Sequence, residues 1–449
     1  MQAVAQTPKA HNYAILKLGL PLIASNVAQF AIHMTDTIML GWYDVTALAA
    51  ATIATTLFFV IFIVGAGFAF AVTPLVAAAA ERGDDVEVRR VTRMGVWLSV
   101  IYGAFVMIPF FWTEGILLWI GQEPDVAALG HDYLIIALWG MIPALIVMTL
   151  KSYLAALEHT AIILWGTVAA AVLNAALNYV LIFGNFGAPE MGIKGAAIAS
   201  VVLHCVTVGI FLVYGLRVLP QYKLLQNVLR PDNEIMKRVF LLGVPIGITS
   251  LAEGGLFSAS AIMMGWIGEL ELAAHGIAIQ LASLTFMVHI GLSQVATIRA
   301  GRALGRGDRA SLKLGGAMAF VLSGIFALVT VLVFLAIPET LVSLFLSPDE
   351  PDRVAVIAVG VALIAMAALF QVVDAAQVMA LGLLRGVQDT AVPMVMATVS
   401  YWVIGLPVSY VLAFTLEIGP VGLWLGLVVG LSVAAVLLNW RFWWRSAAI

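Results

Sequence analysis

Twelve apolar runs recur along this chain, and each is at least as long as the roughly 18 residues that a helix needs to cross a membrane. The chain is 63% hydrophobic and 10% charged, with a mean hydropathy of +1.06, whereas a soluble protein carries roughly 25% charged residues. Continuous apolar runs also exclude an outer-membrane barrel, whose strands alternate over about ten residues. The sequence therefore predicts an all-α polytopic membrane protein with spans near 14–40, 47–79, 94–113, 126–150, 161–183, 192–216, 239–267, 272–298, 314–337, 354–384, 391–416 and 419–440.

The sequence repeats itself at a spacing of 224 residues. The matched segments include Leu18-Gly19-Leu20-Pro21 with Leu242-Gly243-Val244-Pro245, Gly67 with Gly291, and Arg82-Gly83-Asp84 with Arg306-Gly307-Asp308; after a small length change, Thr160 matches Thr390 and Gly192 matches Gly419. Six spans return the chain to its starting side, so the halves should be related by a pseudo-two-fold axis along the membrane normal. We expect a six-helix lobe over 1–216, a linker over 217–238 and a second six-helix lobe over 239–449.

Basic residues gather on one predicted side of the membrane. Twenty of the 22 Lys and Arg, Lys151 and the 217–238 segment among them, are placed there, and only Lys194 and Arg353 fall on the other side. Lys and Arg are enriched in cytoplasmic loops, so both termini and the linker are predicted to be cytoplasmic. Because these basic runs flank spans as topology requires, we expect no nucleic-acid partner.

Three carboxylates, those of Asp36, Glu253 and Asp374, lie in the middle of apolar spans, and we expect no Lys or Arg inside the spans with them. A buried carboxylate without a partner is costly, so it is either protonated or bound to a cation. Ionisable residues inside a membrane usually mark a functional site. These acids favour a cation-coupled transporter. The alternative for each is an inert, protonated carboxyl bonded to a neighbouring helix.

Polar side chains accompany the first acid. Asn26, Gln29, His33 and Asp36 follow one another at steps of three and four residues, so they share one stripe of a helix. The His33 ring is expected to bond either a backbone carbonyl, which we favour, or Asp36. Asn174 and Asn178 lie one turn apart in the fifth span. Their amide oxygens could ligate a small cation, or the amides could join helices by hydrogen bonds.

The second half has a corresponding set of polar residues. Pro245 and the pair Gly254-Gly255 predict a bent or locally opened helix around Glu253. Gln371, Asp374 and Gln377 share one broad face of the tenth span. If Glu253 and Asp374 approach one another, they would share a proton or a cation.

Enzyme motifs are absent from the sequence, which contains no metal-binding His/Cys cluster, P-loop or nucleophile elbow. Without an ATP site, energy must come from an ion gradient or from the solute's own gradient. Aromatic residues make up 10% of the chain and there are 17 Met. Aromatic walls combined with carboxylates favour lipophilic cations as substrates.

Several stretches resemble the multidrug and toxic compound extrusion (MATE) family, in its NorM-like branch, over nearly the whole chain. They are Leu-Gly-Leu-Pro at 18–21, Met-Thr-Asp-Thr-Ile-Met-Leu-Gly at 34–41, Asn174 to Gly184, Gly243 to Glu253, and Asp374 to Thr390. The resemblance implies a V-shaped exporter of twelve helices with a central cleft, a monomer in the bacterial inner membrane. It would exchange Na⁺ or H⁺ for cationic drugs and dyes, confer antibiotic resistance and need no other cofactor.

The resemblance also assigns roles to residues. Glu253 and Asp374 would form the second-lobe cation site, which could hold Na⁺, and Asp36 would form the first-lobe site. A supporting polar network would comprise Asn174, Asn178, Gln280, Gln371 and His33.

Three departures from the family pattern leave sodium and proton coupling both open. Position 370 is Phe where some relatives carry Tyr, Gln280 stands where Asn is expected, and Asn178 replaces an Asp of archaeal relatives.

A lipid-linked oligosaccharide flippase of the same superfamily is the alternative function, and it would share the topology. It should need Lys or Arg within the cleft to hold a pyrophosphate.

Overall fold

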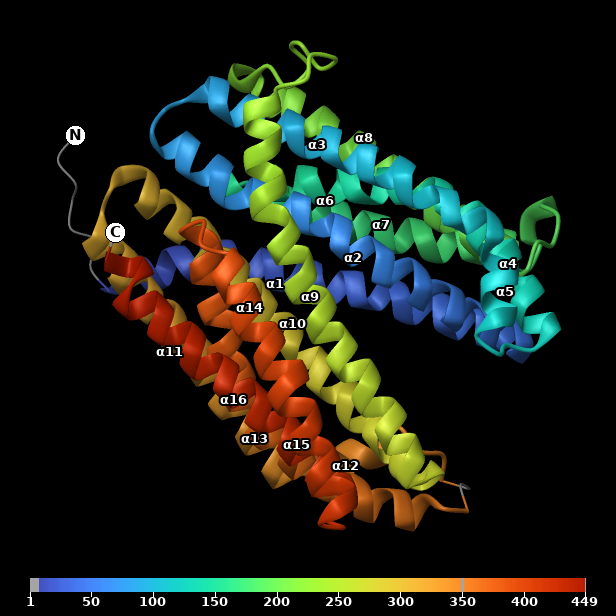
Figure 1. Ribbon diagram of the computed structural model, residues 1–449. Helices are drawn as coiled ribbons and strands as arrows, with labels where there is room; N and C mark the ends of the chain where they lie inside the picture. The colour runs from blue at the N-terminus through green and yellow to red at the C-terminus, as the bar shows by residue number, and fades with distance from the viewer. Residues whose placement is uncertain (1–7, 349–350, 449) are drawn as a thin grey trace. The chain divides into compact units, whose positions relative to one another are not determined.

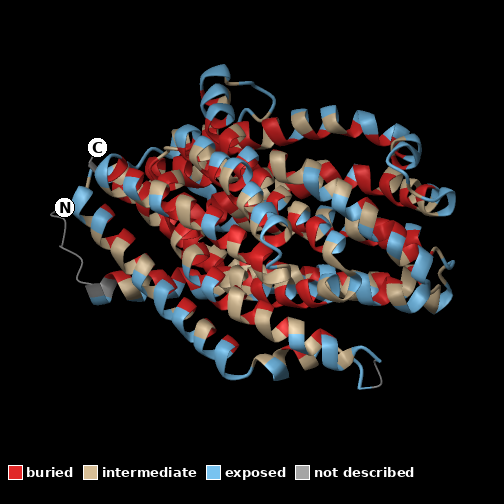
Figure 2. Cartoon of the chain, turned by 60° about the horizontal axis from the view of Figure 1, so that its bottom comes forward, coloured by how far each residue is buried: buried red, intermediate tan, exposed pale blue. Residues whose placement is uncertain are grey.

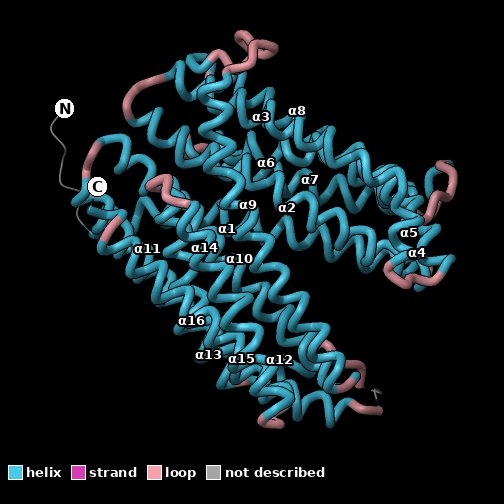
Figure 3. The backbone as a smooth tube through the Cα atoms, viewed as in Figure 1, coloured by secondary structure: helices cyan, strands magenta, loops and turns pink. Residues whose placement is uncertain are grey.

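The computed structural model describes residues 8–348 and 351–448, and within these ranges the chain is helical, without strands (Figure 3). Twelve helical stretches in the described part are long and apolar enough to cross a membrane, and three of them, Asp85–Trp119, Pro124–Ala156 and Ala391–Thr415, join consecutive shorter helices. The twelve predicted spans are therefore confirmed, and most helices extend a few residues beyond the apolar run that predicted them.

The helices, labelled in Figure 1, have the following bounds. They are α1 (Pro8–Tyr43), α2 (Val45–Glu81), α3 (Asp85–Met107), α4 (Thr113–Trp119), α5 (Pro124–Ala137), α6 (Met141–Ala156), α7 (Thr160–Leu181), α8 (Ile193–Val218), α9 (Asn233–Ile267), α10 (Glu269–Arg306), α11 (Arg309–Ala336), α12 (Pro338–Ser343), α13 (Arg353–Gly386), α14 (Ala391–Thr398), α15 (Leu406–Tyr410) and α16 (Pro420–Trp444). Short 3₁₀ or π segments are η1 (Ile108–Trp112), η2 (Leu138–Gly140), η3 (Asn185–Gly187), η4 (Pro220–Tyr222), η5 (Val399–Gly405), η6 (Val411–Thr415) and η7 (Ser446–Ala448).

The chain packs as two compact units. The first-half unit is Ala24–Gly247, and the second-half unit combines Met1–Ile23 with Ile248–Ile449. Both boundaries fall inside a helix, two residues after Pro21 in α1 and two residues after Pro245 in α9. A proline inside a helix removes one backbone hydrogen bond and favours a kink. The first part of α1 therefore belongs to the second-half unit, and the first part of α9 belongs to the first-half unit. The expected lobes 1–216 and 239–449 instead follow the order of the chain.

Matched turns show that the sequence repeat is also a structural repeat. Gly83 and Gly307 both have left-handed backbone angles, with φ of +73° and +67°. The aspartates that follow each accept a hydrogen bond from the backbone N–H three residues on, at 2.8 Å for Asp84 and 3.0 Å for Asp308. Each glycine ends one helix and each aspartate caps the next, as turn chemistry requires. Hydrogen bonds from Ser311 lower the pKa of Asp308, which keeps this cap ionised.

Paired glycines bring helix backbones into close contact at matched places in the two units. In the first-half unit, a Cβ added to Gly67 of α2 would lie 2.6 Å from the backbone nitrogen of Gly247 in α9. In the second-half unit, a Cβ added to Gly291 of α10 would lie 3.0 Å from the backbone of Ile23 in α1. Gly67 matches Gly291 and Gly247 matches Ile23 at the spacing of 224. The same helix crossing is therefore built twice, and it requires glycine on α2 and α10.

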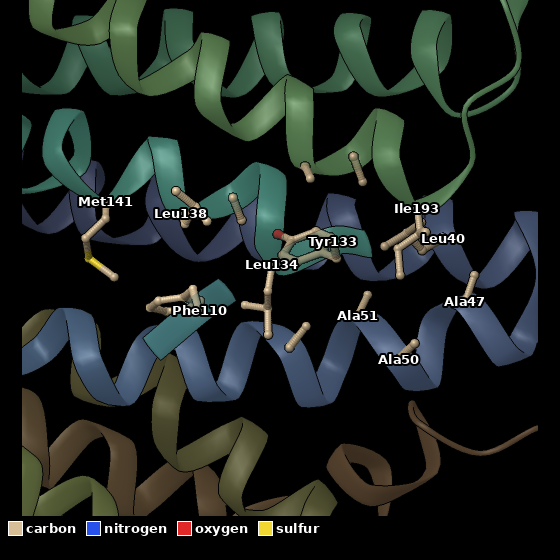
Figure 4. Packing of buried hydrophobic residues seen from close by; sticks show 14 of the residues in the cluster. Leu40, Ala47, Ala50, Ala51, Phe110, Tyr133, Leu134, Leu138, Met141 and Ile193 are labelled. Atoms are coloured by element: carbon tan, nitrogen blue, oxygen red, sulfur yellow. The ribbon is translucent and has the colours of Figure 1, made fainter. Parts of the chain in front are cut away.

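A buried apolar cluster holds part of the first-half unit together. It joins α1, α2, α5, α6 and α8 around residues such as Phe110, Tyr133 and Leu134 (Figure 4). Figure 1 shows α2, α3 and α6 running side by side within this unit, in agreement with their contacts. Many helices carry buried and exposed residues on the same segment (Figure 2), as expected for membrane helices with one face on a bundle.

The connection between α8 and α9 is fastened to the first-half unit. Arg90 of α3 donates a hydrogen bond to Asp232 at 2.5 Å, and the Trp97 indole N–H donates to the carbonyl of Val228 at 2.8 Å. The bond from Arg90 holds the pKa of Asp232 below its usual value. The segment predicted as a linker is thus anchored at its second end by a charged pair.

We predict that Gly67→Ala lowers the free energy of unfolding by about 2 kcal/mol, because the new methyl group would overlap the backbone of α9. The measurement is thermal unfolding of the purified protein in detergent. Gly209→Ala in α8 is the matched control, since nothing lies within 4 Å of a Cβ there. Equal stability of Gly67→Ala and Gly209→Ala would show that this helix crossing tolerates side chains.

Candidate functional site

In the first-half unit, two asparagines of α7 hold the carboxylate of Asp36. The side-chain amides of Asn174 and Asn178 both donate to Oδ1 of Asp36, each at 2.6 Å. Both asparagines are fully buried, one turn apart, whereas Asp36 is half-buried on α1. Two N–H donors on one oxygen complement an ionised carboxylate. The amides therefore act here as donors that join helices, and the second oxygen of Asp36 stays available for a cation.

The rest of the polar stripe lies beside Asp36 on the same helix. His33 is exposed and within electrostatic range of Asp36. In the described part of the chain, its ring bonds neither Asp36 nor a backbone carbonyl, so the reading favoured from the sequence is wrong. One turn earlier, Gln29 accepts a hydrogen bond from the ammonium group of Lys151 at 3.4 Å.

The expectation that the spans contain no basic side chain is wrong. Lys17 and Lys194 lie near the ends of the predicted spans 14–40 and 192–216, and the structure places Lys151 within α6. The apolar run before Lys151 ends at residue 150, but α6 continues to Ala156, with Tyr153 and Leu154 buried. Lys151 is therefore part of the helix rather than of a loop. In the second-half unit, Arg385 in the last turn of α13 interacts electrostatically with Glu253.

The second-half unit brings the other two acids together. Glu253 of α9 is half-buried and accepts a hydrogen bond from the Gln377 amide of α13 at 3.1 Å. Asp374, also on α13, is 1% exposed and lies within electrostatic range of Glu253. Neither carboxylate oxygen of Asp374 has a hydrogen-bond partner within the described residues. A carboxylate buried in this way must be protonated or neutralised by a cation.

Neighbouring amides extend this group of acceptors. Gln371, Asp374 and Gln377 lie on one face of α13, and four of their oxygens are buried without a donor in the described structure. Small hard cations such as Na⁺ take oxygen ligands of this kind, so the residues fit either Na⁺ or a proton. The described residues contain no group of three His, Cys, Asp or Glu side chains suited to a metal ion.

Of the two glutamines expected in the polar network, Gln371 is buried near the acid pair and Gln280 is exposed. The amide of Gln371 is buried and donates to Thr285 of α10 at 2.6 Å, which orients its free oxygen. Gln280 is exposed on α10. Over the residues described, no hydrogen bond links Gln280 to Glu253 or Asp374. Gln371 is therefore a neighbour of the acid pair, and Gln280 is not bonded to it.

Sequence comparison identifies the family. The MatE family model matches residues 21–180 and 245–411, most of the chain and both repeats. The chain belongs to the MatE family. It is similar to a probable multidrug resistance protein NorM of Rhizobium meliloti (strain 1021), with 46% identity covering 96% of this chain and 93% of the relative. A protein described in the same words from Agrobacterium fabrum is 43% identical, covering 96% and 94%.

Solved structures of MATE transporters share the fold. The eukaryotic MATE transporter AtDTX14 aligns with a TM-score of 0.87 at 20% identity, covering 98% of each chain. An outward-facing multidrug resistance MATE family transporter aligns with a TM-score of 0.86 at 21% identity, covering 98% of this chain and 96% of that one. The family model and the relatives named as multidrug resistance proteins point to a membrane transporter rather than an enzyme.

A tyrosine that sequence reasoning missed lies close to the acids of this MatE protein. Tyr401 of η5 is fully buried, interacts electrostatically with Glu253 and Asp374, and has no hydrogen-bond partner for its hydroxyl group among the described residues. Position 370 is Phe and therefore offers no hydroxyl group. Its ring packs edge-to-face against Phe257 and Trp424. Tyr401 lies in an apolar span that has no Asp, Glu, Lys or Arg, so no charged residue in that span drew attention to it. Its place on a π-helical segment, a feature frequent at functional sites, emerges only in three dimensions.

The α9 helix corrects a further expectation. It runs from Asn233 to Ile267 as one continuous helix through Gly254-Gly255, so the locally opened alternative is wrong. Gly255 admits the Trp402 ring instead, since an added Cβ would lie 2.8 Å from it. The indole N–H of Trp402 donates to the carbonyl of Ala252 at 3.0 Å.

We predict that Asn174→Ala destabilises the protein by about 2 kcal/mol, because a half-buried carboxylate loses a charge-assisted donor. Thermal unfolding in detergent is the measurement, with Gln226→Ala in an exposed segment as the control. In the Asp36→Asn background the same substitution should cost clearly less, since the charged acceptor is gone. An equal cost in both backgrounds would mean that Asn174 acts only through packing.

Proposed function

We propose that this MatE protein is a cation-coupled multidrug efflux antiporter of the bacterial inner membrane. It would use a Na⁺ or H⁺ gradient to export lipophilic, mainly cationic compounds by alternating access, as a monomer. Family membership and the NorM-named relatives support drug efflux. The observation that carries cation coupling is the buried, unpartnered carboxylate of Asp374 beside Glu253.

Charge neutralisation supplies the coupling in this proposal. Na⁺ or H⁺ at Glu253 and Asp374 would neutralise buried charge and so favour one arrangement of the surrounding helices. A cationic drug would compete for negative charge and favour another. When two ligands favour different states, each lowers the affinity of the other, and the antagonism is reciprocal. Asp36, with two amide donors on one oxygen, would offer a second site for positive charge.

A lipid-linked oligosaccharide flippase fits the polar residues less well. Such a substrate carries a pyrophosphate and would need several basic groups. In the first-half unit, only one lysine, Lys151, is bonded to the polar stripe of the described α1 helix. The acids of the second-half unit would repel a pyrophosphate.

We predict that Asp374→Asn abolishes ion-coupled efflux while the protein stays folded, because the amide keeps the shape, removes the charge and costs less to bury. Glu253→Gln should behave similarly. The assay is dye efflux from proteoliposomes under separately imposed Na⁺ and pH gradients. Glu339→Gln, in an exposed position on α12, is the control. Wild-type efflux and ion dependence in Asp374→Asn would assign this carboxylate a structural role and refute coupling through it.

We predict that both termini and the connection between α8 and α9 are cytoplasmic, as the distribution of Lys and Arg indicates. In a Cys205→Ala background, which removes the exposed native thiol, a cysteine at Gln226 should resist an impermeant maleimide added to whole cells. A cysteine at Phe186, 88% exposed and on the opposite predicted side, should react readily. Labelling in the reverse pattern would invert the topology.

A further inference from the structure

Lys151 carries a positive charge inside a membrane-spanning helix of the first-half unit. It lies five residues before the end of α6, and its ammonium group donates to Gln29 of α1 at 3.4 Å. Among the described residues, no carboxylate lies within 4.0 Å of this ammonium group. A neutral amide at this distance compensates a desolvated charge only partly. A lysine near a helix end can extend its ammonium group toward the membrane surface, yet this one contacts the polar stripe.

The internal repeat shows that this contact has a counterpart in the second-half unit. At the spacing of 224 residues, Gln29 of α1 matches Glu253 of α9. Each is contacted from the fourth span of its own half, Gln29 by Lys151 and Glu253 by Gln377. The second-half unit therefore pairs an acid, Glu253, with a neutral amide. The first-half unit pairs a neutral amide, Gln29, with a base. The charge at this matched position is reversed in sign.

Other side chains around Lys151 also lack an acidic partner. His204 of α8 interacts electrostatically with both Lys151 and His33. Its Nδ1 atom is buried without a hydrogen-bond partner in the described structure. The nearest acid on the stripe is Asp36, seven residues from Gln29, which is about 10 Å along an α-helix. His33 is exposed, and Lys151 and Asp36 are half-buried, so none of the three is closed off.

We propose that Lys151 binds the carboxylate of zwitterionic compounds whose cationic end lies toward Asp36. The inference rests on the proposed efflux function and names a substrate class and a specificity-determining residue for it. A ligand of this kind would give the ammonium group the counter-ion that the protein does not supply. Purely cationic compounds would use Asp36 without Lys151.

The test compares a rhodamine that has a free carboxylate with its methyl ester, which is purely cationic. Binding to purified protein in phosphatidylcholine nanodiscs is followed by fluorescence anisotropy. Lys151→Met should weaken binding of the free acid at least about tenfold, the loss expected for one charge-assisted contact, and leave binding of the ester within about twofold. Lys151→Arg should restore most of the affinity for the free acid. Lys237→Met, an exposed lysine of the same unit, is the control.

Three results would overturn the inference. Equal losses for acid and ester in Lys151→Met would make Lys151 structural. Unchanged affinity for both would remove it from the binding site. Loss of the Lys151-dependent preference in phosphatidylglycerol nanodiscs would assign the anion site to an anionic lipid headgroup, which phosphatidylcholine does not supply. Ester efflux by the wild type tests the proposed function separately: if the ester is not exported, efflux itself fails, whereas export of the ester without any effect of Lys151 refutes this inference alone.

Discussion

Neutralising a carboxylate inside an apolar helix bundle is the physical requirement on which both candidate sites depend. Asp36 meets part of it with two amide donors from α7 on a single oxygen. Asp374 is buried with neither oxygen bonded, next to the acid Glu253. In the first arrangement hydrogen bonds offset part of the cost of burying a negative charge, and in the second only a bound proton or cation can offset it. A transporter that couples two positive ligands can use both.

The internal repeat provides the frame for this difference. Matched glycines at 67 and 291, and matched turns at 83–84 and 307–308, build the same crossings and caps in both units. The polar residues do not follow the repeat. Glu253 is matched by Gln29, and Asp36 is matched by Ser260. Backbone geometry is therefore shared between the two halves, whereas their charged residues differ. Helix packing places the same constraint on both halves, but a binding site for a charged ligand constrains only the half that contains it.

Much of the fold could be predicted because the membrane imposes a simple rule on sequence. Backbone groups in lipid must be bonded within a helix, so apolar length alone predicts the spans. Their ends are less predictable. The apolar run stopped at residue 150, one position short of Lys151, whereas packing of Tyr153 and Leu154 carries α6 to Ala156. Hydropathy does not register such packing, so a basic side chain that belongs to the helix falls outside the predicted span.

The twelve spans, the repeat and the three acids can be predicted from the sequence alone, because length, periodicity and charge are local properties. Which side chains meet depends on the tertiary structure. It placed both asparagines on Asp36, left Gln280 away from the acids and brought in Tyr401 from a π-helical segment. It also divided the compact units within α1 and α9 rather than between the sequence halves. Such pairings depend on helix crossing and rotation, which are set by contacts between residues far apart in the chain.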